Sequence, residues 1–143
     1  MSAQEIEALL YGASGLLGVS GISNDMRTLL ANDDARAKEA IELFVYRLVR
    51  ELGSLAAASG GIDALIFTGG IGENSPAIRA NVCKQVTWMG IQLDAAANDS
   101  GDTRISAAGS KVSVFVLPTD EDLMIAKHSA ATLFSNVSSK SAS

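Results

Sequence analysis

Three glycines stand between an apolar run and a helix start in the segment Phe67-Thr68-Gly69-Gly70-Ile71-Gly72-Glu73-Asn74-Ser75-Pro76. Residues without side chains let the backbone approach a ligand closely, and a helix amino terminus presents N–H groups that attract negative or polar groups. This pattern favours a nucleotide ligand, although an ordinary strand-to-helix turn with a capped helix would look the same locally. The segment lacks the third glycine of a dinucleotide-binding fingerprint, and the chain contains no Gly-Lys-Ser/Thr ending of a P-loop.

Three acids, Asp120, Glu121 and Asp122, follow Pro118-Thr119 at the end of a second apolar run. Ligands of open α/β sheets collect at the carboxyl ends of strands, and Mg²⁺ prefers one or two carboxylates together with waters and phosphate oxygens. The acids are therefore a candidate magnesium site. Acids in the first turn of a helix also stabilise its dipole, and this simpler explanation is equally good.

A carboxylate and a guanidinium stand close together in Asn24-Asp25-Met26-Arg27. The carboxylate of Asp25 can accept ribose hydroxyls, and the planar guanidinium of Arg27 can stack on a base. Taken alone, the segment is explained more simply by a helix cap followed by a solvated arginine. His128 and Trp88 have no evident partners, so packing is the simpler interpretation for both.

Hydrophobic periodicity and turn residues predict the elements that must position these candidates. A glycine-rich, constrained loop is expected over 14–25, and the stretch 95–110 is expected to be a surface connection. Thr119 and Asp122 resemble a capping box for the last helix. The predicted helices cover residues 6–11, 25–30, 34–58, 76–89 and 120–134, and the predicted strands cover 62–68 and 112–117, with a minor edge strand at 91–93.

The order of these elements predicts an α/β fold in which the two main strands are parallel. The first strand is apolar enough to be buried on both faces. Two parallel strands make a poor sheet, so its neighbours are expected outside this chain. We expect one domain over residues 1–135 and a disordered, serine-rich tail over 136–143.

Overall composition narrows the classes of function. The 143 residues carry a net charge of −5 with no cluster of Lys and Arg, which argues against nucleic acid or an anionic membrane as a partner. One cysteine, Cys83, cannot form an intramolecular disulfide, and no segment has the pattern of a signal peptide or a membrane span. A cytoplasmic protein is the expectation.

The three candidate segments together, in their order and spacing, resemble the motifs of the acetate kinase family, with propionate and butyrate kinases as the close competitors. The resemblance covers nearly the whole chain. It implies part of a ribonuclease H-like domain of the acetate and sugar kinase, Hsp70 and actin fold, with ATP or ADP and Mg²⁺ as cofactors. It assigns Glu121 to the magnesium ion. It assigns the adenosine pocket to Asp25, Met26, Arg27, Gly70, Ile71, Gly72, Glu73 and Asn74.

The resemblance also implies what the chain lacks. The family's catalytic Asp, its transition-state His and Arg, its acetate-contacting Arg and an Asn that binds magnesium would all precede the first residue. We therefore expect no turnover from this chain alone, since phosphoryl transfer depends on those positioned groups. Acetate and acetyl phosphate would bind through an amino-terminal portion or second subunit, and the full enzyme would be a homodimer. The alternative is a non-catalytic nucleotide-binding or assembly module, such as half of a split or truncated enzyme.

Overall fold

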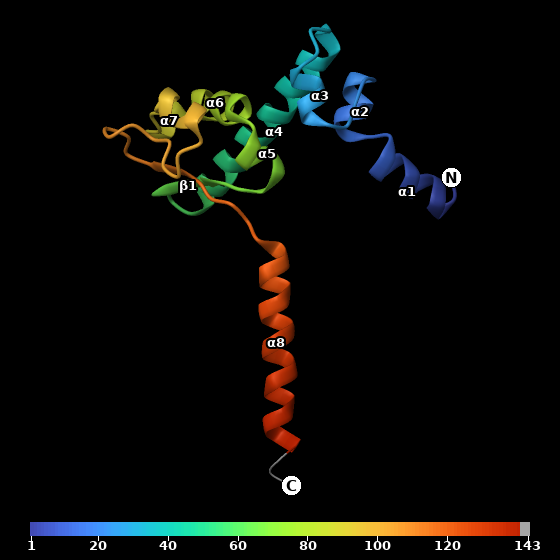
Figure 1. Ribbon diagram of the computed structural model, residues 1–143. Coiled ribbons are helices and arrows are strands. Elements are labelled where there is room, and N and C mark those ends of the chain that lie inside the picture. The colour runs from blue at the N-terminus through green and yellow to red at the C-terminus, as the bar shows by residue number, and fades with distance from the viewer. Residues whose placement is uncertain (141–143) are drawn as a thin grey trace.

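The computed structural model describes residues 1–140, except the side chains of residues 121–122 and 133–140. A compact body holds the middle of the chain, and helices near the two ends project from it (Figure 1). In chain order the elements are α1 (Ala3–Gly12), α2 (Gly15–Ser20), α3 (Met26–Leu30), α4 (Ala35–Ala58), β1 (Ala64–Phe67), α5 (Gly69–Asn74), α6 (Pro76–Gln85), the 3-10 helix η1 (Thr87–Met89), α7 (Ala95–Ser100), β2 (Ser113–Val116) and α8 (Glu121–Lys140).

The sheet consists of β1 and β2, which pair in parallel with Leu65 opposite Val114. This confirms the predicted α/β class and the direction of the two strands. The outer edge of β2 is bridged to residue Arg104 through Phe115, whereas no strand pairs with the other edge of β1 in the part of the chain that the structure describes. One edge of the sheet is therefore open.

One face of the sheet packs in the core and the other does not. Val114 of β2 belongs to the main hydrophobic cluster together with Val86, which follows α6, and Leu65 of β1 packs against this cluster. Ile66 points the other way, because successive side chains of a strand alternate between faces, and it is 52% exposed. The expectation that this strand is buried on both faces was wrong, since among the described residues no second layer covers Ile66.

Helix α4 forms the longest packing surface of the body and confirms the helix predicted over 34–58. Its apolar positions recur every three to four residues, so one stripe contacts α2, α3 and α6. Asp34 caps its amino terminus by accepting from the Arg36 N–H at 2.9 Å. A hydrogen bond from the Arg36 side chain lowers the pKa of Asp34 to about 2. The cap and the apolar stripe together explain where this helix starts and how it lies.

Several segments differ from their predicted form. The glycine-rich segment before Gly21 contains the short helix α2 instead of an irregular loop. The helix expected over 76–89 breaks at Val86, whose side chain is fully buried, and continues as η1 up to Gly90 at φ 90°. The stretch 95–110 is not a plain surface connection, because it contains α7 and buries Asn98 and Ile105. In each case tertiary packing overrides a local preference.

Helices α1 and α8 project from the body in different directions (Figure 1). α1 has no buried residue and exposes Leu10 and Tyr11, and α8 exposes Met124 and Ile125. α8 extends beyond the predicted end at 134. The described helices include none that is long and apolar enough to cross a membrane. Residues 141–143 of the predicted disordered tail lie outside the described residues, and the division at 135 stays a prediction.

Candidate functional site

A cleft of about 510 Å³ brings two of the three candidate segments together. We call it the polar cleft, because five of its lining residues carry polar side chains. One wall comes from the start of α3 and the other from α5 and the start of α6, which follow the carboxyl end of β1. The polar cleft is lined by Asn24, Asp25, Met26, Arg27, Leu30, Gly70, Ile71, Asn74 and Ser75.

Asp25 forms the polar part of the first wall by capping α3. Its carboxylate accepts from the Arg27 N–H at 3.1 Å and from the Thr28 hydroxyl at 3.2 Å. The Arg27 N–H is the main cause that holds the pKa of Asp25 below its ordinary value. The guanidinium of Arg27 lies 3.5 Å from this carboxylate, and its side chain is 87% exposed. An ionised carboxylate and an accessible planar cation therefore stand side by side at the rim.

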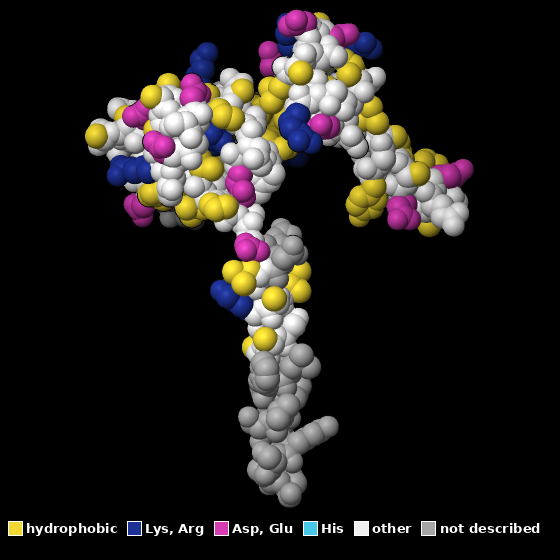
Figure 2. All heavy atoms as spheres, in the orientation of Figure 1, with side chains coloured by type: hydrophobic (Ala, Val, Ile, Leu, Met, Phe, Trp, Pro, Cys, Tyr) yellow, Lys and Arg dark blue, Asp and Glu magenta, His cyan; other side chains and the backbone are white. Residues whose placement is uncertain are grey.

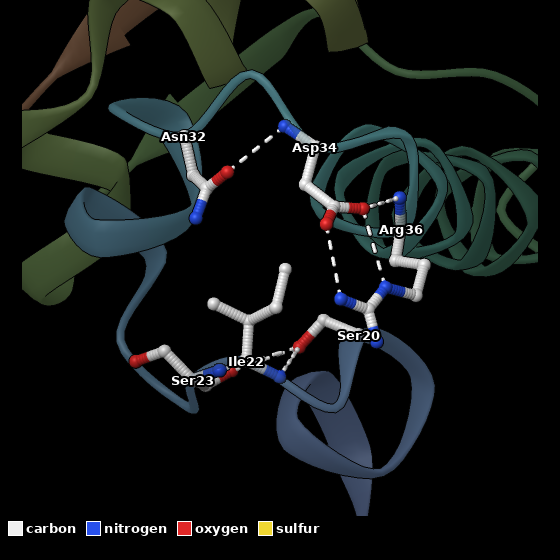
Figure 3. Close-up of polar contacts among 6 residues, drawn as sticks. All are labelled: Ser20, Ile22, Ser23, Asn32, Asp34 and Arg36. Atoms are coloured by element: carbon white, nitrogen blue, oxygen red, sulfur yellow. Dashed lines mark hydrogen bonds and ion pairs between the residues drawn. The ribbon is translucent and has the colours of Figure 1, made fainter.

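The turn before Asp25 is held by a local network (Figure 3). The Ser20 hydroxyl oxygen accepts from the N–H groups of Ile22 at 3.0 Å and Ser23 at 3.3 Å, which fixes the chain reversal after α2. On the other side of α3, Asn32 accepts from the Asp34 N–H at 2.8 Å. Both connections to α3 are thus pinned by short side chains, so the first wall is preformed.

Met26, a predicted ligand residue, is mainly a core residue. It is 4% exposed and packs with Val45, Ile78 and Val82. This contact anchors α3 to α4 and α6. Its small remaining surface lines the polar cleft between Asp25 and Arg27.

The second wall differs from the predicted loop, because Gly69 to Asn74 form the short helix α5. Asn74 donates from its side chain to the Gly70 carbonyl at 2.9 Å, and Ser75 caps α6 by accepting from the Ile78 N–H at 3.4 Å. Pro76 occupies the first turn of α6 as predicted. A Cβ at Gly70 would meet nothing within 4 Å, so this backbone is open to a ligand.

Gly72 faces a different part of the molecule from Gly70. A Cβ at this position would lie 3.4 Å from the carbonyl carbon of Phe67, at the short end of ordinary contact, so a branched side chain would press on the backbone of β1. The close approach of α5 to β1 explains this glycine without a ligand. Its predicted contact with a nucleotide stays a prediction.

Glu73 is predicted to bind the ligand, but its carboxylate is engaged inside the protein. One oxygen accepts from the Gly69 N–H at 2.7 Å, from the Thr119 N–H at 3.0 Å and from the Thr119 hydroxyl at 3.1 Å. The Thr119 N–H is the largest of the causes that lower the pKa of Glu73. These bonds place the segment after β2 against α5, so the third candidate segment adjoins the second.

The predicted magnesium ligand, Glu121, has a side chain outside the described residues, so its contacts stay a prediction. Two residues before it, the Thr119 hydroxyl donates to Glu73. The expected capping box needs the side chain of Asp122, which lies outside the described residues, so it stays a prediction. Asp120 takes the capping role by accepting from the Leu123 N–H at 2.8 Å. Among the side chains that the structure describes, no three acids, histidines or cysteines are grouped to hold a metal ion.

A second hollow of about 560 Å³ lies between α4 and the open edge of β1. We call it the apolar groove, because Thr68 is the one lining residue with a polar side chain. Gly70 and Ile71 line both hollows, so α5 separates them. The apolar groove is lined by Phe44, Leu48, Leu52, Leu65, Ile66, Phe67, Thr68, Gly70, Ile71, Gly72 and Val82.

Arg79 was missed by the sequence analysis. It is 1% exposed, and it donates to the carbonyl oxygens of Gly72 and Glu73 and to Asn98. A signal was available, because Arg79 lies three and four residues before the buried Val82 and Cys83. An arginine on the apolar stripe of a helix must find hydrogen-bond acceptors inside the protein.

Solved structures that share this arrangement define the class of protein. An acetate kinase of Porphyromonas gingivalis matches 93% of this chain with a TM-score of 0.82 and 41% identity. A propionate kinase of Francisella tularensis matches 87% of it with a TM-score of 0.78 and 39% identity. The matches cover 35% and 33% of those chains. The fold is thus part of an acetate and propionate kinase fold, as the sequence analysis expected.

Sequence comparison then gives the family. The chain belongs to the acetokinase family, whose sequence profile matches residues 1–127. An acetate kinase of Rhodopseudomonas palustris (strain TIE-1) is 68% identical over 130 residues, and one of Rhizobium meliloti is 56% identical over 133. The match covers 90% of this chain and 33% of the R. palustris protein. The chain therefore spans about a third of the length of the curated relatives that it matches.

Proposed function

We propose that this chain is the nucleotide-binding part of an acetate kinase, an enzyme that reversibly transfers a phosphoryl group from ATP to acetate and forms acetyl phosphate and ADP. The observation that carries the proposal is the polar cleft, which joins the Asp25 segment to the Gly70 segment at the carboxyl end of a parallel strand. Such strand ends are where open α/β sheets bind ligands. Membership of the acetokinase family makes ATP or ADP the ligand of choice.

Three polar residues of the cleft have a role in this proposal. The ionised Asp25 carboxylate accepts hydrogen bonds from the ribose hydroxyls, and the exposed Arg27 guanidinium stacks on the base. The open backbone at Gly70 and Ile71 contacts the nucleotide directly, and Asn74 adds a polar contact. Met26 adds its small exposed surface to the first wall, whereas Gly72 and Glu73, which do not line the cleft, are proposed to support the nucleotide contact by holding α5 in place.

Glu121 is proposed as a ligand of Mg²⁺. The Glu73 to Thr119 bonds bring the start of α8 beside α5, which supports this assignment. A hard cation suits a carboxylate near the phosphates, where it would neutralise charge during transfer. The protein's contribution is to hold that carboxylate at the end of β2, which Asp120 stabilises by capping α8.

The partner is proposed to be the remaining part of an acetate kinase, in the same or a second polypeptide. The open edge of β1 and the apolar groove beside it are a surface that such a partner would cover, since a strand edge next to Ile66 and Phe44 is unfavourable in water. Acetate and acetyl phosphate bind through that partner. We expect the complete enzyme to be a cytoplasmic homodimer.

The chain alone is proposed to be inactive, because the groups that the family uses on the transferring phosphate match no residue here. The alternative function is a non-catalytic nucleotide-binding or assembly module. The apolar groove does not distinguish the enzyme part from the non-catalytic module, because half of a split enzyme and a truncated enzyme would both expose it.

Calorimetry with ADP and Mg²⁺, combined with an assay for acetyl phosphate, tests the proposal. We expect the chain to bind ADP without turnover, and to gain turnover when the remaining two thirds of the R. palustris acetate kinase are added. Binding that never leads to turnover would support the non-catalytic module. Absence of binding by a monomeric, folded sample would contradict the nucleotide site, and turnover by the chain alone would contradict the proposed inactivity.

A further inference from the structure

Arg79 forms the most extensive buried polar contact near the polar cleft. Its Nη1 donates to the Gly72 carbonyl at 2.9 Å and to the Glu73 carbonyl at 2.7 Å. Its Nε donates to Asn98 Oδ1 at 2.8 Å, and its Nη2 donates to the Asn98 carbonyl at 2.8 Å. One guanidinium on α6 therefore joins the end of α5 to α7.

This burial is energetically demanding, which argues that the contacts matter. The side chain is 1% exposed, and no described carboxylate forms an ion pair with it. Burial lowers the pKa of Arg79, and a buried charge is tolerated only when good hydrogen bonds replace its water. Four acceptors within 2.9 Å provide that replacement, and two of them belong to α5.

Arg79 donates to the carbonyls of Gly72 and Glu73, which lie in the last turn of the short helix α5. The last turn of any helix carries unsatisfied C=O groups and a partial negative charge, which a cation stabilises. α5 has six residues, too few to be stable by itself. At its other end, the Glu73 carboxylate accepts from the Gly69 N–H. Two charged side chains thus hold the helix that separates the polar cleft from the apolar groove.

We infer that Arg79 is the positioning residue of the polar cleft: it fixes the end of α5, and through α5 the backbone of Gly70 and the side chain of Asn74. Lysine cannot replace it, because an ammonium is a point charge and cannot reach acceptors on two helices in one plane. The consequence for ligand affinity rests on the proposed function. The effect on α5 itself does not.

Hydrogen exchange of the complete 143-residue chain tests the inference with Arg79→Lys. We expect the amides of 70–75 to exchange about ten- to a hundredfold faster, as expected for lost bonds to a charged donor, while amides in the middle of α4 are unchanged. Arg50→Lys, in an exposed residue on α4, is the matched control and should leave both segments unchanged. Equal acceleration in α4 and α5, or none in α5, would overturn the inference.

If the Arg79→Lys chain does not fold, a second variant tests the inference. Asn98→Ala removes the acceptor of Nε and leaves both α5 carbonyls bonded. It should accelerate exchange of 70–75 by a smaller factor, again without change in α4, and unchanged exchange there would overturn the inference.

ADP titration of the same samples separates this inference from the proposed function. If the wild-type chain binds ADP, Arg79→Lys should weaken binding at least tenfold without a matching shift in the urea midpoint of a folded sample. Unchanged affinity despite faster exchange of α5 would overturn the positioning role. If the wild-type chain does not bind ADP, the proposed function fails, and the exchange data still decide whether Arg79 fixes α5.

Discussion

The polar cleft and the apolar groove lie on the two sides of α5 and share Gly70 and Ile71, yet their surfaces are built differently. In the polar cleft, Asp25 and Asn74 already have partners within the protein, so their positions are set before any ligand arrives. In the apolar groove, large side chains and an open strand edge face solvent. A small polar ligand suits the first hollow, and a polypeptide suits the second.

This difference shows which part of the molecule is held by its own contacts and which part is left uncovered. The turns around α3 and the ends of α5 are fixed by hydrogen bonds that Ser20, Asn32 and Glu73 accept and that Arg79 donates. In contrast, Ile66 is 52% exposed on the uncovered face of the sheet. Hydrophobic side chains on the surface, shown in yellow, also cover much of α1 and the first part of α8 (Figure 2). The polar cleft is therefore held in place by contacts within the described residues, whereas the apolar face of the sheet is left uncovered by them.

The largest effect is expected from a charge in the apolar groove. Ile66→Lys should weaken association with the remaining two thirds of the R. palustris acetate kinase by about a hundredfold or more, because a desolvated charge would face the open edge of β1. ADP affinity in the polar cleft should not change. Sedimentation velocity measures the association, and Trp88→Lys, at a 67% exposed residue away from the groove, is the control. Equal loss in both variants would show that the groove is not the docking surface.

Two of the three glycines of α5, Gly70 and Gly72, give the next effect. Gly72→Val should lower the free energy of unfolding by about 1–3 kcal/mol, since its side chain would collide with the backbone of Phe67. Gly70→Val has open space and should cost less than about 1 kcal/mol. Urea denaturation measures both. ADP titration should show the reverse order, with Gly70→Val weakening binding more, and the same order in both assays would contradict the separation of the two hollows by α5.

Removal of the rim cation should affect the ligand and nothing else. Arg27→Ala is expected to weaken ADP binding by roughly 1 kcal/mol, the typical strength of a cation on an aromatic ring, while stability and association stay the same. Isothermal titration calorimetry measures the affinity. Arg50→Ala removes an exposed arginine from α4 as the control. A loss of stability comparable to the loss of affinity would mean that Arg27 acts through the fold.

The smallest effect concerns the bonds between Glu73 and Thr119. Because the pKa of Glu73 is lowered in the folded chain, the unfolded state takes up this proton first as the pH falls. Its contribution to stability is complete above the ordinary pKa of 4.5 and is lost as the pH falls through the lower folded value. Thermal melts between pH 6 and pH 3, a range of about three pH units, measure this loss. The melting temperature should decline less steeply with falling pH for Glu73→Gln than for the wild type.

Glu39→Gln is the control for this pH dependence, because it removes an exposed acid from α4. It should retain the wild-type decline. A Glu73→Gln chain that declines as steeply as the wild type would show that the bonds to Thr119 do not contribute. The ADP affinity of the Glu73→Gln chain should fall only if Glu121 moves with the start of α8.

Local signals were enough for much of the site. Ser75 was identified as a helix cap and Pro76 as a first-turn residue, because such roles depend on a few neighbouring backbone groups. A cap was expected just before the helix at 25–30, and the structure places it on Asp25 itself. The open backbone at Gly70 was also predicted from a local property, because glycine has no side chain to cover the backbone. The assignments of Gly72 and Glu73 as ligand contacts could not be refined from the sequence, since their partners, Phe67 and Thr119, were identified only in the folded chain.

By itself the sequence determined the long helix α4, both parallel strands, the family and most of the residues that line the polar cleft, because periodicity, caps and motifs are properties of neighbouring residues. Tertiary structure alone decided that Asn98 is buried, that Arg79 holds the end of α5, and that the apolar groove lies across α5 from the ligand site. These features join segments far apart in the chain, and burial of a polar group depends on every segment that packs around it.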